Sequence, residues 1–387
     1  GWLSSNDRDS WADARDELLK AGGAKMEAAL EKLQSGALLL CLDDEDPISR
    51  KQCGEVFWTG GVTDGATSGH NRWFDKSVQL LCTNNGKAGL LGEHSMMDGM
   101  PVVGLADHIT KTSYRVTQNK SFGLTNEGGD DIENIFQGFD LPTVDEHIAN
   151  AKSHLNQLVG DHDLNVQSFQ GYGSNYIKKA GFSPDAYVQM AIQLATYRLW
   201  GQQGATYEAT QMRPFLHGRT ETTRTVSPAS AAFVKTMGPR PKHDESDEVA
   251  RKEKLDLLRD AVGIHVKYIT EAAKGKGVDR HFLGLSMMVE DGEEAPALYA
   301  HPVFARAKTW RVSTSHLTHK NFDNWGFGEV VSNGVGVGYA VKADCCVFNI
   351  TARKEHQWTE RLSHLLEEAL LEMQILVEMD KAPSSRL

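Results

Sequence analysis

The sequence of 387 residues has little of several features that would place it in a specialised class. It has only five cysteines and no Cys-x-x-Cys pair, which excludes a disulfide framework and argues against a cysteine-ligated zinc site. Basic residues are fewer than acidic ones, 41 against 52, so the net charge of −11 argues against a nucleic-acid-binding protein. No apolar run approaches the roughly 20 residues that span a bilayer. The low cysteine usage favours a reducing compartment.

Two catalytic motifs and an initiator methionine are also missing. No Gly-x-Ser-x-Gly and no His-Glu-x-x-His occurs, which argues against a serine hydrolase of that type and against a zinc protease. The chain begins at Gly1, so a targeting segment cannot be judged from it. It ends on Ser385-Arg386-Leu387, a sequence similar to the peroxisomal Ser-Lys-Leu signal. The alternative is an ordinary polar tail.

What is present predicts an α/β protein in which helices cover sheets. Asn84-Asn85-Gly86 lies between two apolar runs and predicts a β-hairpin, with His94 at the end of its second strand. A capping box of Thr143 and Glu146 predicts a helix start there, and Ser183 followed by Pro184 predicts another. Apolar periodicity predicts helices over residues 141–159, 182–200, 248–275 and 356–382, and strands within 310–317 and 334–351.

The stretch LLGEHSMMDGMP contains a histidine followed four residues later by Asp98 and a glycine. A neutral imidazole at the end of a strand can accept a proton from an alcohol, because the histidine pKa lies near working pH. His94 is therefore a candidate general base. The aspartate is better placed to hold a cation than to contact the imidazole. The alternative is a histidine that only packs, since a single His-x-x-x-Asp pattern also arises by chance.

Further motifs extend this pattern along the chain. They are NRWFDKS at 71–77, SPDAYVQMAIQLA at 183–195, TYEATQMRPFLHGRTETTRT at 206–225, STSHL at 313–317 and FGEVVSNGVGVGY at 327–339. Together with the histidine, and in this order and spacing, the chain resembles the choline/carnitine acyltransferase family. The resemblance implies two related coenzyme A-dependent acyltransferase-like α/β domains. Residues 1–137 would be the remainder of the N-terminal domain, whose first part is absent here, and residues 138–387 the C-terminal domain.

The resemblance also implies roles for individual residues on the acceptor side. His94 would be the general base, and Asp98 a structural acid of the site. Arg280, Tyr207 and Thr220 would bind the carnitine carboxylate, which suits a cation flanked by two hydroxyl groups. The remaining implied residues are Ser313 for carnitine, Ser315 for the developing oxyanion, Phe327 for the trimethylammonium group and Trp325 for the acyl pocket.

On the coenzyme A side, the resemblance implies contacts from Lys178, Lys179, Ser183, Asp185 and His316. The plain alternatives are solvated lysines, a helix start and a polar strand. Some positions depart from the family pattern: Ser174 stands where many members carry a coenzyme-binding lysine, and His316 replaces a frequent glutamine. Ala209, Asn333, Val335 and Gly338 also depart from it, which puts the efficiency of the reaction in question.

The sequence therefore predicts a carnitine O-acyltransferase, acetyl-specific because Trp325 is bulky. Carnitine is favoured over choline because Thr220 and Thr222 stand where choline-specific relatives have Val and Asn. Acyl-CoA and carnitine are the expected partners, with no permanent cofactor, no metal, no nucleic acid and no transmembrane segment. The alternatives are a catalytically weak or silent subunit of a larger assembly and a medium-chain enzyme. The expected compartment is the peroxisome, the mitochondrion or both.

Overall fold

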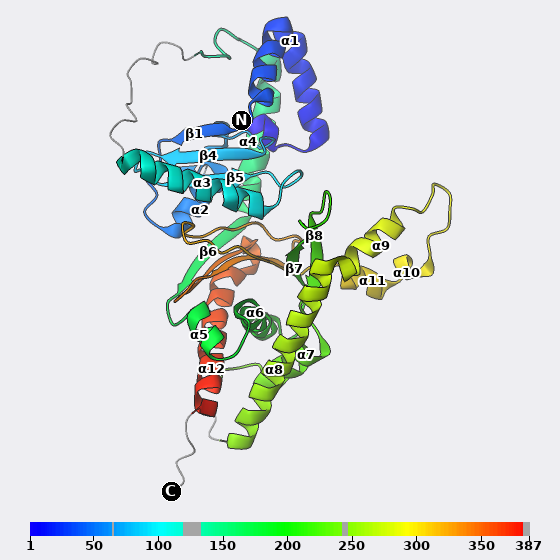
Figure 1. Ribbon diagram of the computed structural model, residues 1–387. Helices are drawn as coiled ribbons and strands as arrows, with labels where there is room; N and C mark the ends of the chain where they lie inside the picture. The colour runs from blue at the N-terminus through cyan, green and yellow to red at the C-terminus, as the bar shows by residue number, and fades with distance from the viewer. Residues whose placement is uncertain (64–65, 119–132, 242–246, 382–387) are drawn as a thin grey trace. The chain divides into compact units, whose positions relative to one another are not determined.

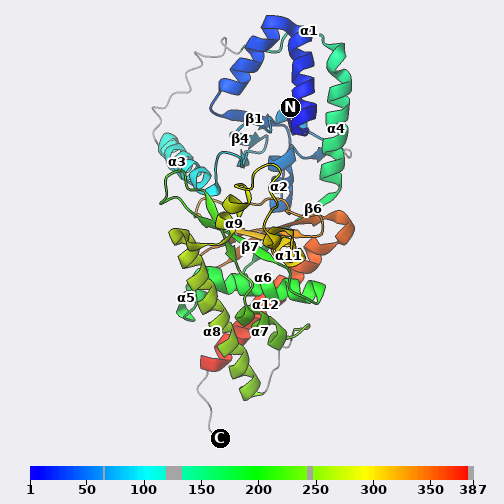
Figure 2. The same ribbon diagram turned by 90° about the vertical axis from the view of Figure 1, so that its right-hand side faces the viewer.

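The computed structural model describes residues 1–63, 66–118, 133–241 and 247–381. The chain forms two compact units, residues 1–161 and 162–387. Each unit combines a sheet with helices, which confirms the predicted α/β class (Figures 1 and 2). The predicted division after residue 137 refers to correspondence with family domains and stays a prediction. None of the described helices is long and apolar enough to cross a membrane.

The first unit is built around a three-stranded sheet in the order β1-β4-β5, in which β1 is parallel and β5 antiparallel to β4. Its longest helices are α1 and α3, and a two-stranded ribbon joins β2 to β3. The elements are η1 (Trp2–Ser5), α1 (Arg8–Ser35), β1 (Leu39–Asp43), α2 (Arg50–Thr59), β2 (Val62–Thr63), β3 (Ala66–Thr67), η2 (Gly69–Asn71), β4 (Val78–Thr83), β5 (Ala88–Gly92), α3 (Gly99–Gln118), η4 (Pro142–Val144) and α4 (Asp145–Gly160).

The β4–β5 pair is the predicted hairpin. Gly86 has a positive φ of 77°, which a side chain would disfavour, and this permits the tight connection. A buried ion pair fixes β1 nearby: Asp43 accepts hydrogen bonds of 2.8 and 2.7 Å from the Arg72 guanidinium. Strand β5 ends at Gly92, so His94 lies in the loop two residues beyond the strand.

The second unit contains a six-stranded sheet in the order β6-β11-β10-β9-β7-β8. The central strands β10, β9 and β7 are parallel, and the other neighbours are antiparallel. The elements are β6 (His162–Phe169), α5 (Ser174–Lys179), α6 (Pro184–Trp200), β7 (Thr206–Gln211), β8 (Thr220–Arg224), α7 (Pro228–Met237), α8 (Glu248–Glu271), η5 (Ala272–Lys276), α9 (Asp279–Ser286), α10 (Ala297–Ala300), α11 (Pro302–Ala307), β9 (Val312–His316), β10 (Val335–Val341), β11 (Cys346–Arg353), η6 (Lys354–His356) and α12 (Trp358–Lys381).

Helix α6 forms the centre of this unit's core. It contacts α7, α8 and α12, and all but four of its residues are buried, as expected for a helix that is apolar on most sides (Figure 1). It starts as predicted, with Ser183 at the N-cap and Pro184 at the first helical position. This start fixes Asp185 in the first turn, where the helix dipole favours a negative charge.

Two predicted details are wrong. Helix α4 has Val144 at its N-cap with no side-chain hydrogen bond, so Thr143 and Glu146 form no capping box. Pro142 starts a 3₁₀ turn over residues 142–144, which places the threonine inside a turn rather than before the helix. On α8, the sequence pattern predicts one apolar face made of Leu255, Leu258, Val262, Val266 and Ile269, but Val266 is 38% exposed. His265 is buried there instead.

Candidate functional site

Strands β7, β9 and β10 carry the predicted substrate contacts of the second unit on two faces. Successive side chains of a strand point to opposite faces, and the register aligns Tyr207 with Ser313 and Ser315 with Gly338. Tyr207, Ser313 and Ser315 therefore share one face. Glu208, Thr314, His316 and Tyr339 share the other face, which packs against α6 and is called the helical face below.

A cavity of about 610 Å³ lies beside the N-terminal end of α6. Of the predicted coenzyme A contacts, Lys178, Ser183, Asp185 and His316 line it, whereas Lys179 is not among its lining residues. The other lining residues are Ser174, Pro184, Thr318, His319, Lys320, Val341, Lys342 and Ala343. The structure thus brings together residues from three separate segments that the sequence alone could relate only through the resemblance.

Main-chain hydrogen bonds hold the cavity in shape. The amide of Ser174 donates to the Lys342 carbonyl at 2.8 Å, and the amide of Asn175 donates to Ala343 at 2.9 Å, which ties α5 to the end of β10. Three lysines, Lys178, Lys320 and Lys342, contribute to the lining. Sequence reasoning missed Lys320 and Lys342, because each is a single lysine in a loop with no motif around it. Their positive charges favour an anionic ligand. They also provide cations around Ser174, the position at which many family members carry a coenzyme-binding lysine.

The wall of the cavity contains a histidine–aspartate contact. The Nδ1 of His316 lies 3.2 Å from Oδ1 of Asp185, and its ring stacks on Tyr339 at 5.0 Å. Tyr339 donates its hydroxyl to the same carboxylate at 2.7 Å. Burial would raise the pKa of Asp185, but hydrogen bonds from His265, His316 and Tyr339 outweigh it and hold that pKa below its usual range. Asp185 is thus an ionised carboxylate at the cavity wall.

The predicted carboxylate site is centred on Arg280, at the start of α9. Its Nε donates to the Thr220 carbonyl at 2.8 Å, and its terminal nitrogen lies 3.3 Å from the Thr220 hydroxyl. Arg224 of β8 holds this helix end through two hydrogen bonds to Asp279, at 2.9 and 2.6 Å. The amide of Arg280 also lies 3.3 Å from the Glu221 carboxylate. Arg280 and Thr220 therefore meet, with the arginine exposed to solvent.

Tyr207 lies further along the same hairpin. In the β7–β8 register Thr220 faces Gln211, whereas Tyr207 faces Arg224. Four residues of strand, roughly 13 Å of backbone, separate the two predicted contacts, although they point to the same face. The Tyr207 ring packs on Trp310 at 5.7 Å between ring centres. A ligand that uses both hydroxyl groups must therefore reach between them, aided by the length of the tyrosine side chain.

The predicted acyl-pocket residue belongs to a segment that lies directly on β10. The indole of Trp325 donates to the Tyr339 carbonyl at 3.1 Å, and its ring is 5.4 Å from that of Phe327. A Cβ atom at Gly338 would approach the Trp325 carbonyl oxygen to 2.9 Å, and one at Gly336 would approach the Gly328 carbonyl oxygen to 2.7 Å. The absent side chains are what allow this segment to lie against β10 at the two glycines, whose register partners on β9 are Ser313 and Ser315.

His94 is exposed in its loop, with 76% of its side chain accessible. Its Nδ1 lies 2.9 Å from the Met97 carbonyl oxygen. A carbonyl oxygen can only accept, so Nδ1 carries the proton, and Nε2 of the neutral ring keeps a lone pair that can accept another. Asp98 lies 3.7 Å from the same Nδ1. The sequence predicts that Asp98 holds a cation rather than contacts the imidazole. The structure differs, because the loop turns back between residues 94 and 98 and brings the carboxylate close enough to interact with the ring.

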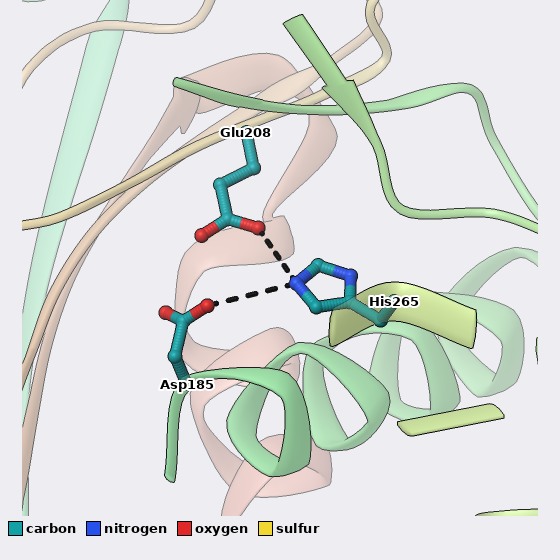
Figure 3. Close-up of side chains that lie close together, drawn as sticks. All are labelled: Asp185, Glu208 and His265. Atoms are coloured by element: carbon teal, nitrogen blue, oxygen red, sulfur yellow. Dashed lines mark ion pairs between the residues drawn. The ribbon is translucent and has the colours of Figure 1, made fainter. Parts of the chain in front are cut away.

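A buried group of three ionisable residues was missed at the sequence level. His265 of α8 lies 3.1 Å from Glu208 of β7 and 3.6 Å from Asp185 of α6, and Figure 3 shows its Nε2 directed at both carboxylates. These residues are far apart in the sequence and follow no spacing rule. The only sequence signal was a histidine within the apolar stripe of a helix, which usually indicates a satisfied core residue.

Comparisons with known proteins give one consistent result. Residues 1–368 match the family described as Choline/Carnitine o-acyltransferase. The mitochondrial carnitine O-acetyltransferase of Saccharomyces cerevisiae is 32% identical over 100% of this chain and 56% of its own length. The carnitine O-acetyltransferase of Columba livia is 34% identical over 100% of this chain and 60% of its own length. The choline O-acetyltransferase of Danio rerio is 30% identical over 97% of this chain and 58% of its own length. The chain thus spans a little over half the length of these relatives.

Proposed function

We propose, from the premise that the chain belongs to the choline/carnitine O-acyltransferase family, that the protein transfers a short acyl group reversibly between coenzyme A and carnitine. The observation that carries the proposal is the contact between Arg280 and Thr220. It offers a guanidinium and a hydroxyl side by side to an acceptor that carries a carboxylate. Choline has no carboxylate, so the same pair favours carnitine over choline.

The cavity beside α6 supports the second substrate. Coenzyme A carries several phosphate oxygens, and Lys178, Lys320 and Lys342 surround a space large enough for part of it. Asp185 and His316 add hydrogen-bonding groups at the wall. Both substrates are held as diffusible ligands, so the reaction needs no group attached to the protein.

In the proposed mechanism, Nε2 of His94 takes the proton from the carnitine hydroxyl, and the resulting alkoxide attacks the thioester carbonyl. The Ser315 hydroxyl donates to the oxygen on which negative charge develops, an interaction that is stronger in the transition state than in the ground state. The tetrahedral intermediate then expels the coenzyme A thiolate, which takes the proton back from the imidazolium. Asp98 supports the imidazolium electrostatically through its 3.7 Å approach to Nδ1. Ser313 and Phe327 contact the acceptor, the latter through a cation–π interaction.

The proposed acyl specificity rests on Trp325. Its indole is anchored to β10 through the Tyr339 carbonyl, and the Trp325 backbone lies against Gly338, the register partner of Ser315. The proposal is that the bulk of this indole limits the length of the acyl chain. Acetyl and other short acyl groups are therefore the proposed donors.

The decisive experiment is carnitine-dependent release of free thiol from acetyl-CoA by the full-length protein, with His94→Ala beside it. General-base catalysis contributes about 10²–10⁴-fold, so this variant should lose at least a hundredfold in kcat while still binding coenzyme A. A loss below tenfold removes His94 from the role of base. No thiol release by the wild type would favour the silent family member, and faster release with choline or octanoyl-CoA would favour another acceptor or a medium-chain enzyme.

The proposed compartments are the peroxisome and the mitochondrion. Ser385 to Leu387 lie outside the described residues, and the yeast relative bears a mitochondrial name. Deleting residues 385–387 from a tagged full-length protein should move it out of peroxisomes. If the intact protein is found only in mitochondria, the tail is no address.

A further inference from the structure

The group of Asp185, Glu208 and His265 joins three elements at the centre of the second unit. Both carboxylates approach the same imidazole nitrogen, at 3.6 and 3.1 Å, from α6 and β7 (Figure 3). His265 and Glu208 are almost completely buried, whereas Asp185 reaches the cavity wall with 23% of its side chain exposed. A protonated imidazole between two carboxylates offsets their negative charge at a buried position where water cannot do so.

The charge state of the group follows from its surroundings. Burial alone would lower the pKa of His265, but the two carboxylates outweigh burial and raise it to about 9. Burial, reinforced by the charge of Asp185, raises the pKa of Glu208 to about 7. His316 on β9 faces Asp185, and Tyr339 on β10 faces both carboxylates. The imidazole is thus protonated near neutral pH and forms ion pairs with the two carboxylates, and the group is called the ion triad below.

The triad continues into a hydrogen-bond network beneath the acceptor side. Gln189 of α6 donates at 2.9 Å to both the Tyr339 hydroxyl and the Thr314 hydroxyl. Thr314 in turn donates at 2.7 Å to the carbonyl of Tyr207. Tyr339 donates to Asp185 at 2.7 Å. An unbroken series of contacts therefore runs from the cavity wall to the backbone of the strand that carries Tyr207.

We propose that His265 is a positioning residue that holds the coenzyme A side of the site, through Asp185, to strand β7 of the acceptor side. The inference rests on the proposed function and assigns a role to a residue that contacts neither substrate. Without the imidazolium, the ionised forms of Asp185 and Glu208 repel each other across a buried space, and this repulsion grows as the pH rises above about 7. Asp185, the more exposed of the two, then turns outward and changes the shape of the cavity wall.

The test uses His265→Gln in the full-length protein, with His154→Gln on the exposed surface of α4 as the matched control. Calorimetry measures the Kd for coenzyme A, and initial rates give the KM for carnitine. H265Q should weaken coenzyme A binding about tenfold and change the carnitine KM less than about threefold, while H154Q changes neither. Adding Glu208→Gln to H265Q should restore coenzyme A binding to within about threefold, because the repulsion is then removed.

Several outcomes overturn the proposal. Unchanged coenzyme A binding in folded H265Q does so, and so does an equal loss on both substrates that E208Q fails to rescue, which would indicate a structural role only. Nitrogen NMR of the imidazole is a separate readout, and a neutral His265 at pH 7.5 also overturns it. If H265Q does not fold, E208Q alone should make His265 titrate at lower pH, and an unchanged titration counts against the proposal.

The same measurements separate this inference from the proposed function. A wild type that binds coenzyme A but releases no thiol with carnitine overturns the proposed transfer and leaves the Kd and NMR arms decisive for His265. A wild type that does not bind coenzyme A overturns both.

Discussion

The two faces of the six-stranded sheet differ in chemistry, although the same three strands supply both. The helical face presents Glu208 and Tyr339 to partners on α6 and α8: Glu208 lies 3.1 Å from His265, and Tyr339 donates to Asp185 at 2.7 Å. The opposite face presents small groups, Ser313 and Ser315, beside glycines that admit a neighbouring segment. A strand period of two thus places fixed ionic groups on one face and small side chains on the other. Under the proposed function, the first face borders the coenzyme A cavity and the second face takes carnitine and the acyl chain.

The largest effect should come from changing the proposed acyl pocket. Trp325→Gly removes the indole that is proposed to limit the acyl pocket, and we expect it to admit octanoyl-CoA with a gain of at least a hundredfold in kcat/KM for that donor. One methylene in a pocket accounts for about 10–200-fold in discrimination, and octanoyl adds several. The measurement is kcat/KM for acetyl-, butyryl- and octanoyl-CoA. Trp325→Phe is the matched control and should keep the short-chain preference; a wild type that already prefers octanoyl-CoA removes the indole from this role.

The carboxylate site should give the next largest effect. Changing Arg280 to Asn and Thr220 to Val together should raise the carnitine KM about a hundredfold and leave the KM for acetyl-CoA within about twofold. Removing one partner of a charged hydrogen-bonded pair costs about 2–5 kcal/mol. Arg259→Asn, on the exposed surface of α8, is the control. If both KM values rise together, the two faces do not separate the substrates as proposed.

A smaller effect should come from the cavity lysines. Lys320→Ala should raise the KM for acetyl-CoA about threefold to tenfold, since one cation near a phosphate is lost. The same change should have little effect on a dephospho-coenzyme A donor if the lysine serves the 3′-phosphate. Lys235→Ala, exposed on α7, is the control. An equal effect on both donors would place Lys320 near another part of the ligand.

The smallest effect concerns stability and pH. The pKa of Glu208 is raised from 4.5 to about 7, so the folded chain keeps a proton that the unfolded chain releases. This contribution is fully present below pH 4.5 and is lost as pH rises through about 7. His265, raised from 6.5 to about 9, acts in the same direction at higher pH. Between pH 5 and 8 the wild-type Tm should therefore fall a few degrees more than that of Glu208→Gln. Parallel Tm curves would contradict the assigned shift.

Local patterns predicted the local structure well. The hairpin at Asn84 to Gly86 and the start of α6 follow from turn and capping chemistry that acts within a few residues. The capping box at Thr143 failed because Pro142 began a different turn one residue earlier. A single proline thus decides whether these residues form a capping box or a 3₁₀ turn.

The site could be predicted only in part. The resemblance named Lys178, Asp185 and His316, which the structure brings together around one cavity. It could not name Lys320 or His265, because their neighbours come from other elements and depend on the sheet register and on helix packing. A histidine in an apolar stripe looks the same in sequence whether it lies between two carboxylates or between two leucines.

Gly338 has a consequence for the evolution of the chain. Any side chain there would press against the backbone at Trp325, so a mutation at position 338 is tolerated only if the segment over β10 shifts as well. In descendants of this protein the two positions should therefore change together. A lineage that gains a side chain at 338 would have to give up the present position of the tryptophan, and with it the proposed limit on acyl length.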